Sequence, residues 1–219
     1  MKILVVSPHP DDETLAAGGT ILRYKKEGKK VYWLNITNVK EEYGYSKERV
    51  ISRNKEIDRV NKLYNFDGFY NLGLEPAGLD KYSKGELIGK ISEVVKEVKP
   101  NVVILPYKYD VHSDHELVYD CVYSCTKSFR HPFVKKVLAM EIISETDFAS
   151  YEHGFIPNYF VDISAHLDKK IEVLQIYESE LGAHPFPRSI DNIKALATLR
   201  GASAGVRYAE SFMLIKNIE

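Results

Sequence analysis

The chain of 219 residues carries 30 basic and 31 acidic side chains, a formal net charge of -1, and 44% of its residues are hydrophobic. This balance excludes the basic surface of a nucleic-acid-binding protein, and no apolar run is long enough to predict a membrane span. The apolar stretch at the start of the chain is too short for a secretory signal. The two cysteines, Cys121 and Cys125, lie on one predicted helix and form no disulfide framework, which favours a reducing compartment. We therefore expect a single globular domain over residues 1–219, located in the cytoplasm.

Strand-like and helix-like patterns alternate along the chain. A short β-branched run predicts a buried strand that ends before Pro8, and apolar residues then recur at helical spacing until Gly28. This alternation predicts right-handed crossovers, so the expected fold class is α/β, a Rossmann-like domain with a mostly parallel sheet and helices on both faces. Strands are predicted at 2–7, 31–37, 69–72, 102–106, 137–143, 159–163 and 211–216, and helices at 13–27, 49–64, 86–98, 115–129, 167–181 and 190–200.

Polar residues crowd the end of the first predicted strand, where the chain reads Pro8-His9-Pro10-Asp11-Asp12-Glu13. Ligands of such sheets bind beyond the carboxyl ends of the strands. Acidic residues are favourable in the first turn of a helix because its dipole is positive there. That effect does not explain a histidine held between two prolines. His9 and Asp12, three residues apart across a tight bend, can converge on one metal ion.

A second polar cluster follows the strand at 102–106 and reads Asp110-Val111-His112-Ser113-Asp114-His115-Glu116. Ser113 with Glu116 fits a capping box that would start the next helix. The capping box leaves His112, Asp114 and His115 without a structural reason. Catalytic zinc takes three protein ligands and keeps a fourth position for water, so the two clusters together predict a metal site. Iron, manganese or cobalt also suit a site of two histidines and one carboxylate.

Both clusters resemble motifs of the LmbE-like, or PIG-L-like, N-acetylglucosaminyl deacetylase family. Two further segments fit the family, the Arg53-Asn54-Lys55-Glu56 element and the C-terminal stretch from Arg200-Gly201-Ala202 to Gly205-Val206-Arg207-Tyr208-Ala209-Glu210-Ser211-Phe212. The resemblance covers nearly the whole chain. It implies a zinc ion bound by His9, Asp12 and His115, and a homo-oligomer, either a trimer or a hexamer.

The resemblance also assigns roles to the remaining residues of the motifs. Asp11 matches the general base that activates the attacking water. His112 matches the imidazole that stabilises the oxyanion or protonates the leaving amine, and Asp114 matches the carboxylate that orients this imidazole. Arg53 matches an arginine that contacts the substrate. The roles of Asp110 and of the segment Gly205–Glu210 stay open.

The sequence therefore predicts a zinc-dependent hydrolase that removes the N-acetyl group from an N-acetylglucosamine-type sugar or its conjugate, with this small molecule as its partner. General base help from Asp11 accelerates such a reaction about 10²–10⁴-fold. One alternative keeps the metal but changes the bond, giving an amidase or an O-deacetylase with another acyl substrate. Another alternative is a metal-containing sugar-binding protein without catalysis.

Overall fold

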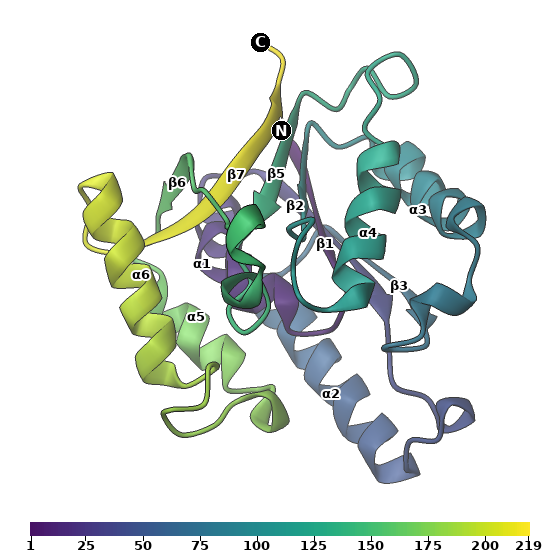
Figure 1. Cartoon of the computed structure of the whole chain (residues 1–219), viewed down its shortest axis with the longest axis horizontal. Coiled ribbons are helices and arrows are strands. Elements are labelled where there is room, and N and C mark those ends of the chain that lie inside the picture. Colours follow the sequence, from purple (N-terminus) through teal and green to yellow (C-terminus); the bar gives the residue numbers. More distant parts are fainter.

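The strands of the chain form one seven-stranded sheet in the order β3-β2-β1-β4-β5-β7-β6. The computed structural model describes all of residues 1–219 (Figure 1). Strands β1 to β5 run parallel to one another, as the sequence predicts, whereas β7 is antiparallel to both β5 and β6. The strands are β1 (Lys2–Ser7), β2 (Lys30–Thr37), β3 (Gly68–Leu74), β4 (Val102–Leu105), β5 (Lys136–Met140), β6 (Tyr159–Asp162) and β7 (Ala209–Asn217).

Helices cover both faces of this sheet, which confirms the predicted α/β class. In β1, Ile3 and Val5 belong to one buried core with residues of α1, α2, α5 and α6, whereas Leu4 and Val6 belong to a second core with residues of α3 and α4. Successive side chains of a strand point to opposite faces, so one apolar strand serves both cores. No helix of the chain is long and apolar enough to cross a bilayer. The helices are α1 (Asp12–Lys26), α2 (Lys47–Tyr64), α3 (Lys84–Val98), α4 (Ser113–Ser124), α5 (Leu167–Leu174) and α6 (Ile190–Ala204).

The strand order reverses between β1 and β4, which pair in register through Ile3 with Val102 and Val5 with Ile104. Beyond this point β1 leads into α1 and β4 leads into α4. The two connecting segments therefore diverge from neighbouring positions at the carboxyl edge of the sheet. Such a switch point leaves a crevice in which α/β proteins bind their ligands. Both polar clusters of the sequence therefore lie at the same crevice.

Two helices are shorter than the sequence predicts. Helix α4 ends at Ser124 instead of residue 129, where the Ser124 and Thr126 hydroxyls donate to the carbonyls of Asp120 and Tyr123 in the last turns. Helix α5 ends at Leu174 instead of residue 181, and a short 3-10 turn at Glu178–Glu180 follows. The apolar pattern continues past the end of α5 because Tyr177 is fully buried in the core.

The C-terminal segment that the sequence left open holds α1 in place. The buried Glu210 carboxylate accepts hydrogen bonds from the backbone of Gly19 (2.8 Å) and Thr20 (2.7 Å) and from Lys170 Nζ (2.7 Å). Gly201 is required because a Cβ there would lie 2.6 Å from the carbonyl oxygen of Arg207. This part of the motif therefore supports the helix that carries the first cluster and lies outside the polar cavity described below.

Candidate metal centre and active site

Three ligand atoms of the two clusters form a nearly equilateral triangle at the switch point. His9 Nδ1 lies 3.4 Å from Asp12 Oδ2 and 3.3 Å from His115 Nε2, and His115 Nε2 lies 3.4 Å from Asp12 Oδ2. Ligand atoms that bind a tetrahedral zinc ion at about 2.0–2.1 Å are separated from one another by about 3.3–3.4 Å. The geometry and the donor types of these residues therefore fit a catalytic zinc site with one position left open.

The imidazole of His112 lies close to the same place. Ring nitrogens of His9, His112 and His115 all fall within 4.8 Å of one another, so a site of three histidines is a second way to hold a metal ion. The triangle that includes Asp12 is tighter and has tetrahedral spacing. Asp12 also contributes a negative charge, and its carboxylate accepts the backbone N–H of His9 at 2.8 Å, which fixes its position. We therefore take His9, Asp12 and His115 as the candidate metal ligands.

Each candidate histidine ligand has a carboxylate on its other ring nitrogen. Asp110 Oδ2 lies 2.8 Å from His115 Nδ1, and the Thr146 hydroxyl donates to Asp110 Oδ1 at 2.6 Å. Asp114 Oδ2 lies 3.1 Å from His9 Nε2. Carboxylates in this position fix the tautomer and orientation of metal-binding histidines. The carboxylate of Asp114 thus bonds to His9, whereas its backbone N–H is the group that contacts the His112 ring, and Asp110 acquires a role that the sequence left open.

Asp110→Asn is expected to weaken metal binding about 10- to 100-fold, the usual effect of removing such a partner. The amide keeps the size of the side chain but removes the charge that supports the His115 imidazole. Titration of the metal-free variant with zinc in the presence of a competing chelator measures the affinity. Asp147→Asn, at an exposed position in the next loop, is the matched control. Equal affinities for Asp110→Asn and the unaltered protein would contradict the assignment.

The protonation of the two candidate histidine ligands predicts how metal binding depends on pH. Burial alone lowers the pKa of His9, but hydrogen bonds to Asp114 and Asp12 outweigh it and raise the pKa to about 9. Burial also opposes protonation of His115, whereas the charge of Asp12 and the bond to Asp110 raise its pKa to about 10. The surrounding carboxylates therefore favour the protonated form of both imidazoles in the metal-free protein.

Zinc binding at neutral pH is consequently expected to release about two protons, because a metal ion binds only neutral imidazole. The affinity should rise with pH by up to about 100-fold per unit while both histidines are protonated in the free protein. Calorimetric titrations at one pH in buffers of different ionisation enthalpy count the released protons. A release of none would show that the ligand histidines are already neutral.

His112 is the N-cap of helix α4, and its imidazole is a neutral hydrogen-bond donor. Its ring Nδ1 accepts the backbone N–H of Asp114 at 3.1 Å, so the N-cap of α4 is His112 and the predicted capping box of Ser113 with Glu116 does not form. Burial and the charges of His9 and His115 lower the pKa of His112 to about 4. The ring is therefore neutral near neutral pH. A neutral ring whose Nδ1 accepts must carry its proton on Nε2.

Asp11 combines an unusual backbone with a buried carboxylate. Its φ of 149° lies in a region that non-glycine residues rarely adopt, and such outliers gather at functional sites. The carboxylate is 3% exposed and accepts a hydrogen bond of 2.9 Å from Arg188 Nη1. Burial and the charge of Asp12 raise the pKa of Asp11, and the Arg188 guanidinium opposes this rise. Asp11 is thus a strong base for a carboxylate, held by one arginine.

Arg188 and Glu180 are site residues that the sequence analysis missed. Arg188 also donates to Ser144 Oγ (2.7 Å) and Glu145 Oε1 (3.1 Å), and Glu180 contacts Arg49, Arg53 and Arg188. Both residues lie in the irregular segment between α5 and α6, far along the chain from the two clusters. Their only sequence signal was charge in a segment rich in proline, which is also typical of an exposed loop.

Arg53, the expected substrate contact, reaches the cavity wall but is largely occupied. It is 5% exposed, its Nη1 donates to the Pro10 carbonyl at 2.8 Å, and its Nη2 pairs with Glu180. Its Nε lies 3.4 Å from Glu56 Oε2. Arg53 therefore supports the first cluster directly through the Pro10 carbonyl, and Glu56 supports it indirectly through its contact with Arg53.

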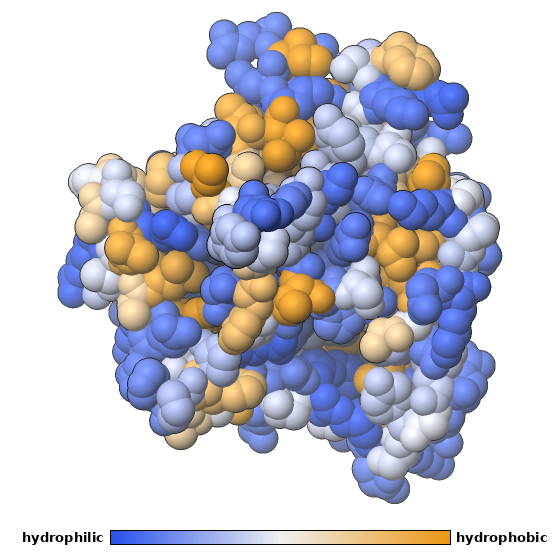
Figure 2. All heavy atoms as spheres, viewed as in Figure 1, coloured by the Kyte–Doolittle hydropathy of each residue, from blue (hydrophilic) through white to orange (hydrophobic).

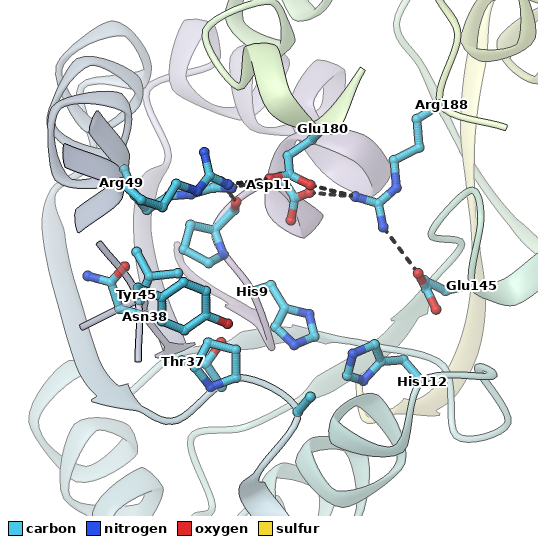
Figure 3. Close-up of a pocket in the computed structure, with 15 residues that line it drawn as sticks. His9, Asp11, Thr37, Asn38, Tyr45, Arg49, His112, Glu145, Glu180 and Arg188 are labelled. Atoms are coloured by element: carbon cyan, nitrogen blue, oxygen red, sulfur yellow. Dashed lines mark hydrogen bonds and ion pairs between the residues drawn. The ribbon is translucent and has the colours of Figure 1, made fainter. Parts of the chain in front are cut away.

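The site opens into a polar cavity of about 310 Å³, and only three of its 15 lining residues are hydrophobic. This volume is at the lower end of the range for small-molecule sites, about 300–1,000 Å³. Figure 3 shows His9 and His112 on one side of the cavity and Arg188 with Glu145 beside them. The wall opposite carries Thr37, Asn38, Tyr45 and Arg49. A cavity with this lining suits a hydrophilic ligand.

Fold and site together define an α/β protein with a candidate metal centre at the switch point of its sheet. Residues 4–126 match the family described as GlcNAc-PI de-N-acetylase, PIG-L, which is more than half of the chain. The chain therefore belongs to the PIG-L family, as the motifs of the sequence predict.

Two relatives with curated descriptions are named as deacetylases. A diacetylchitobiose deacetylase of Thermococcus kodakarensis is 26% identical over 99% of this chain and 84% of its own length. A probable N-acetyl-alpha-D-glucosaminyl L-malate deacetylase 2 of Bacillus anthracis is 26% identical over 81% of this chain and 80% of its own. Among solved structures, the conserved protein TT1542 from Thermus thermophilus superposes with a TM-score of 0.79 at 28% identity, covering 99% of this chain and 96% of that one.

Proposed function

We propose that this protein is a zinc-dependent deacetylase that hydrolyses the N-acetyl amide of an N-acetylglucosamine-type sugar or its conjugate. The observation that carries this proposal is the triangle of His9, Asp12 and His115 in one polar cavity with Asp11 and His112. Amides are resistant to water because water is a poor nucleophile and the amine a poor leaving group. A bound zinc ion supplies Lewis acidity there, lowering the pKa of water from 15.7 to about 7 and polarising a carbonyl.

Asp11 and His112 have complementary tasks in this reaction. Asp11 accepts a proton from the attacking water, because its carboxylate is buried, basic and held by Arg188. His112 donates Nε2–H to the amide oxygen as that oxygen gains negative charge. Because the neutral His112 ring would become an imidazolate if it gave up Nε2–H, the proton that the leaving amine requires is the one taken up by Asp11. One carboxylate thus serves first as base and then as acid.

The remaining residues of the site support these groups. We infer that Asp114 and Asp110 orient the two histidine ligands, and that Arg53 contributes to substrate binding by shaping the wall next to Pro10. The metal in the cell can also be iron, manganese or cobalt, since all suit the same donors. A single domain, a homo-oligomer of three or six chains and a cytoplasmic location complete the proposal and follow from the sequence and the resemblance alone.

The names of the two relatives support an amino-sugar substrate, because both describe removal of acetyl from an N-acetylglucosamine-type unit. They differ in the second unit, which is a further amino sugar in one and malate in the other. An amidase or O-deacetylase acting on another acyl compound would use the same residues. A non-catalytic sugar-binding protein would not need the strained, buried Asp11.

Release of free amine from a panel of N-acetylglucosamine derivatives tests the proposal. The panel holds N,N'-diacetylchitobiose, simple glycosides, an O-acetyl sugar and an acyl-amino acid, each with metal-free and zinc-loaded protein. Zinc-dependent release from the amino sugars is expected. Release confined to the acyl-amino acid or the O-acetyl sugar would favour the other hydrolases, and none with zinc bound at one equivalent would favour the binding protein.

A further inference from the structure

The outer wall of the cavity contains two polar side chains from one short segment. Tyr45 and Arg49 lie on either side of Ser46, the N-cap of α2, and both line the cavity that holds the candidate metal centre. Figure 3 shows both residues on the side away from Arg188 and Glu145. The catalytic steps proposed above use neither residue. The segment is therefore free to contact a part of the substrate other than the reacting amide.

Arg49 is the least occupied of the three arginines at this cavity. Its side chain is 32% exposed, and its one hydrogen bond to a side chain is from Nη2 to Glu180 Oε1 at 3.1 Å. Glu180 is shared, because Arg53 and Arg188 also contact it. Arg49 thus keeps most of its five N–H donors for a ligand.

Two further features make the surroundings of Arg49 suitable for an anion. The Tyr45 hydroxyl points into the cavity in Figure 3, so it can donate to a ligand. The N-terminus of α2, an 18-residue helix, lies between the two residues, and the positive end of a helix dipole favours negative charge nearby. Figure 2 shows hydrophobic side chains interspersed with hydrophilic ones on this face of the molecule. A ligand that extends out of the cavity along Tyr45 and Arg49 therefore meets polar side chains.

We propose that Arg49 and Tyr45 form a subsite for an anionic group, a carboxylate or a phosphate, on the unit attached to the amino sugar. This inference rests on the proposed function and narrows it to acidic conjugates over neutral oligosaccharides. Arg49 pairs with the anion through its planar guanidinium group, whose geometry matches both a carboxylate and a phosphate. Its hydrogen bond to Glu180 is then either broken or kept beside the bonds to the anion. Tyr45 donates its hydroxyl to the same group.

Binding of matched product analogues tests the subsite independently of turnover. The probes are three glucosamine glycosides whose second units are carboxymethyl, its uncharged carboxamide and 2-phosphoethyl. Calorimetry with the zinc-loaded protein measures the Kd of each, and the N-acetylated carboxamide is assayed for amine release in parallel. The variants are Arg49→Gln, Tyr45→Phe and, as a matched loss of charge on the exposed side of the same helix, Lys55→Gln. Thermal unfolding checks that each variant is folded.

The unaltered protein is expected to bind at least one anionic probe about 10- to 100-fold more tightly than the carboxamide, as for one charge-assisted hydrogen-bonded pair. Arg49→Gln should abolish this preference, Tyr45→Phe should reduce it, and Lys55→Gln should keep it. The ranking of carboxymethyl and 2-phosphoethyl identifies the anion. Equal binding of all three probes, or a preference that survives in Arg49→Gln, would overturn the inference. Failure to release amine from the N-acetylated carboxamide would instead count against the proposed function.

Discussion

Asp11→Asn is expected to lower kcat about 10²–10⁴-fold while leaving zinc binding nearly unchanged. The amide has the shape of the carboxylate, but it cannot accept a proton from water. Arg188 keeps its bonds to Ser144 and Glu145, so the wall of the cavity is retained. Single-turnover rates of amine release, with metal content measured on the same sample, check the result.

Asp12→Asn is the matched control for this prediction, because it changes the adjacent residue and removes a candidate metal ligand. It should lose zinc together with activity, whereas Asp11→Asn should lose activity alone. A variant at Asp11 with near-normal kcat would show that another group accepts the proton. In that case the buried Asp11–Arg188 pair would have a purely structural role.

His112→Ala is expected to reduce kcat about 10²–10³-fold, the usual effect of deleting one hydrogen-bond donor to a developing oxyanion. Burial and the neighbouring positive charges lower the pKa of His112 to about 4 in the metal-free protein. Because burial persists and a bound zinc ion would replace those positive charges, the imidazole is expected to be neutral throughout the neutral range. Its removal should therefore leave the shape of the pH–rate profile across the neutral range unchanged. Initial rates across that range, with saturating zinc, provide the measurement.

His112→Gln separates this hydrogen-bonding role from proton transfer. A glutamine amide can donate to the oxyanion but cannot act as an acid, so it should recover part of the rate lost in His112→Ala. If glutamine recovers nothing and the basic limb of the profile disappears in both variants, His112 acts as the proton donor to the amine, and the neutral-donor account is wrong.

The sequence was sufficient to predict the parallel part of the sheet and the place of the site. Uninterrupted apolar runs such as Val102–Leu105 specify strands buried on both faces, and the polar residues after β1 and β4 mark where these strands end. The ends of α4 and α5 were predicted less well. Tyr177 continues the helical spacing of apolar residues, yet it is buried beyond the end of α5. The spacing of apolar residues therefore does not show where this helix ends.

The site residues within the motifs were predicted because their chemistry is local. His9, Asp12 and His115 converge as the two motifs required, although the carboxylate of Asp114 bonds to His9 and contacts His112 only through its backbone N–H. That pairing depends on which ring nitrogen faces which carboxylate, and ring orientation is set by tertiary packing. Arg188 lies 177 residues from Asp11 along the chain, so only the folded chain brings the two together.

Anomalous diffraction at the zinc edge from crystals of the zinc-loaded protein tests the central claim most directly. The account predicts one peak about 2.0–2.2 Å from His9 Nδ1, Asp12 Oδ2 and His115 Nε2, with no ligand bond from His112. A peak bound by His9, His112 and His115 instead, with Asp12 away from the ion, would contradict both the ligand set and the role given to His112.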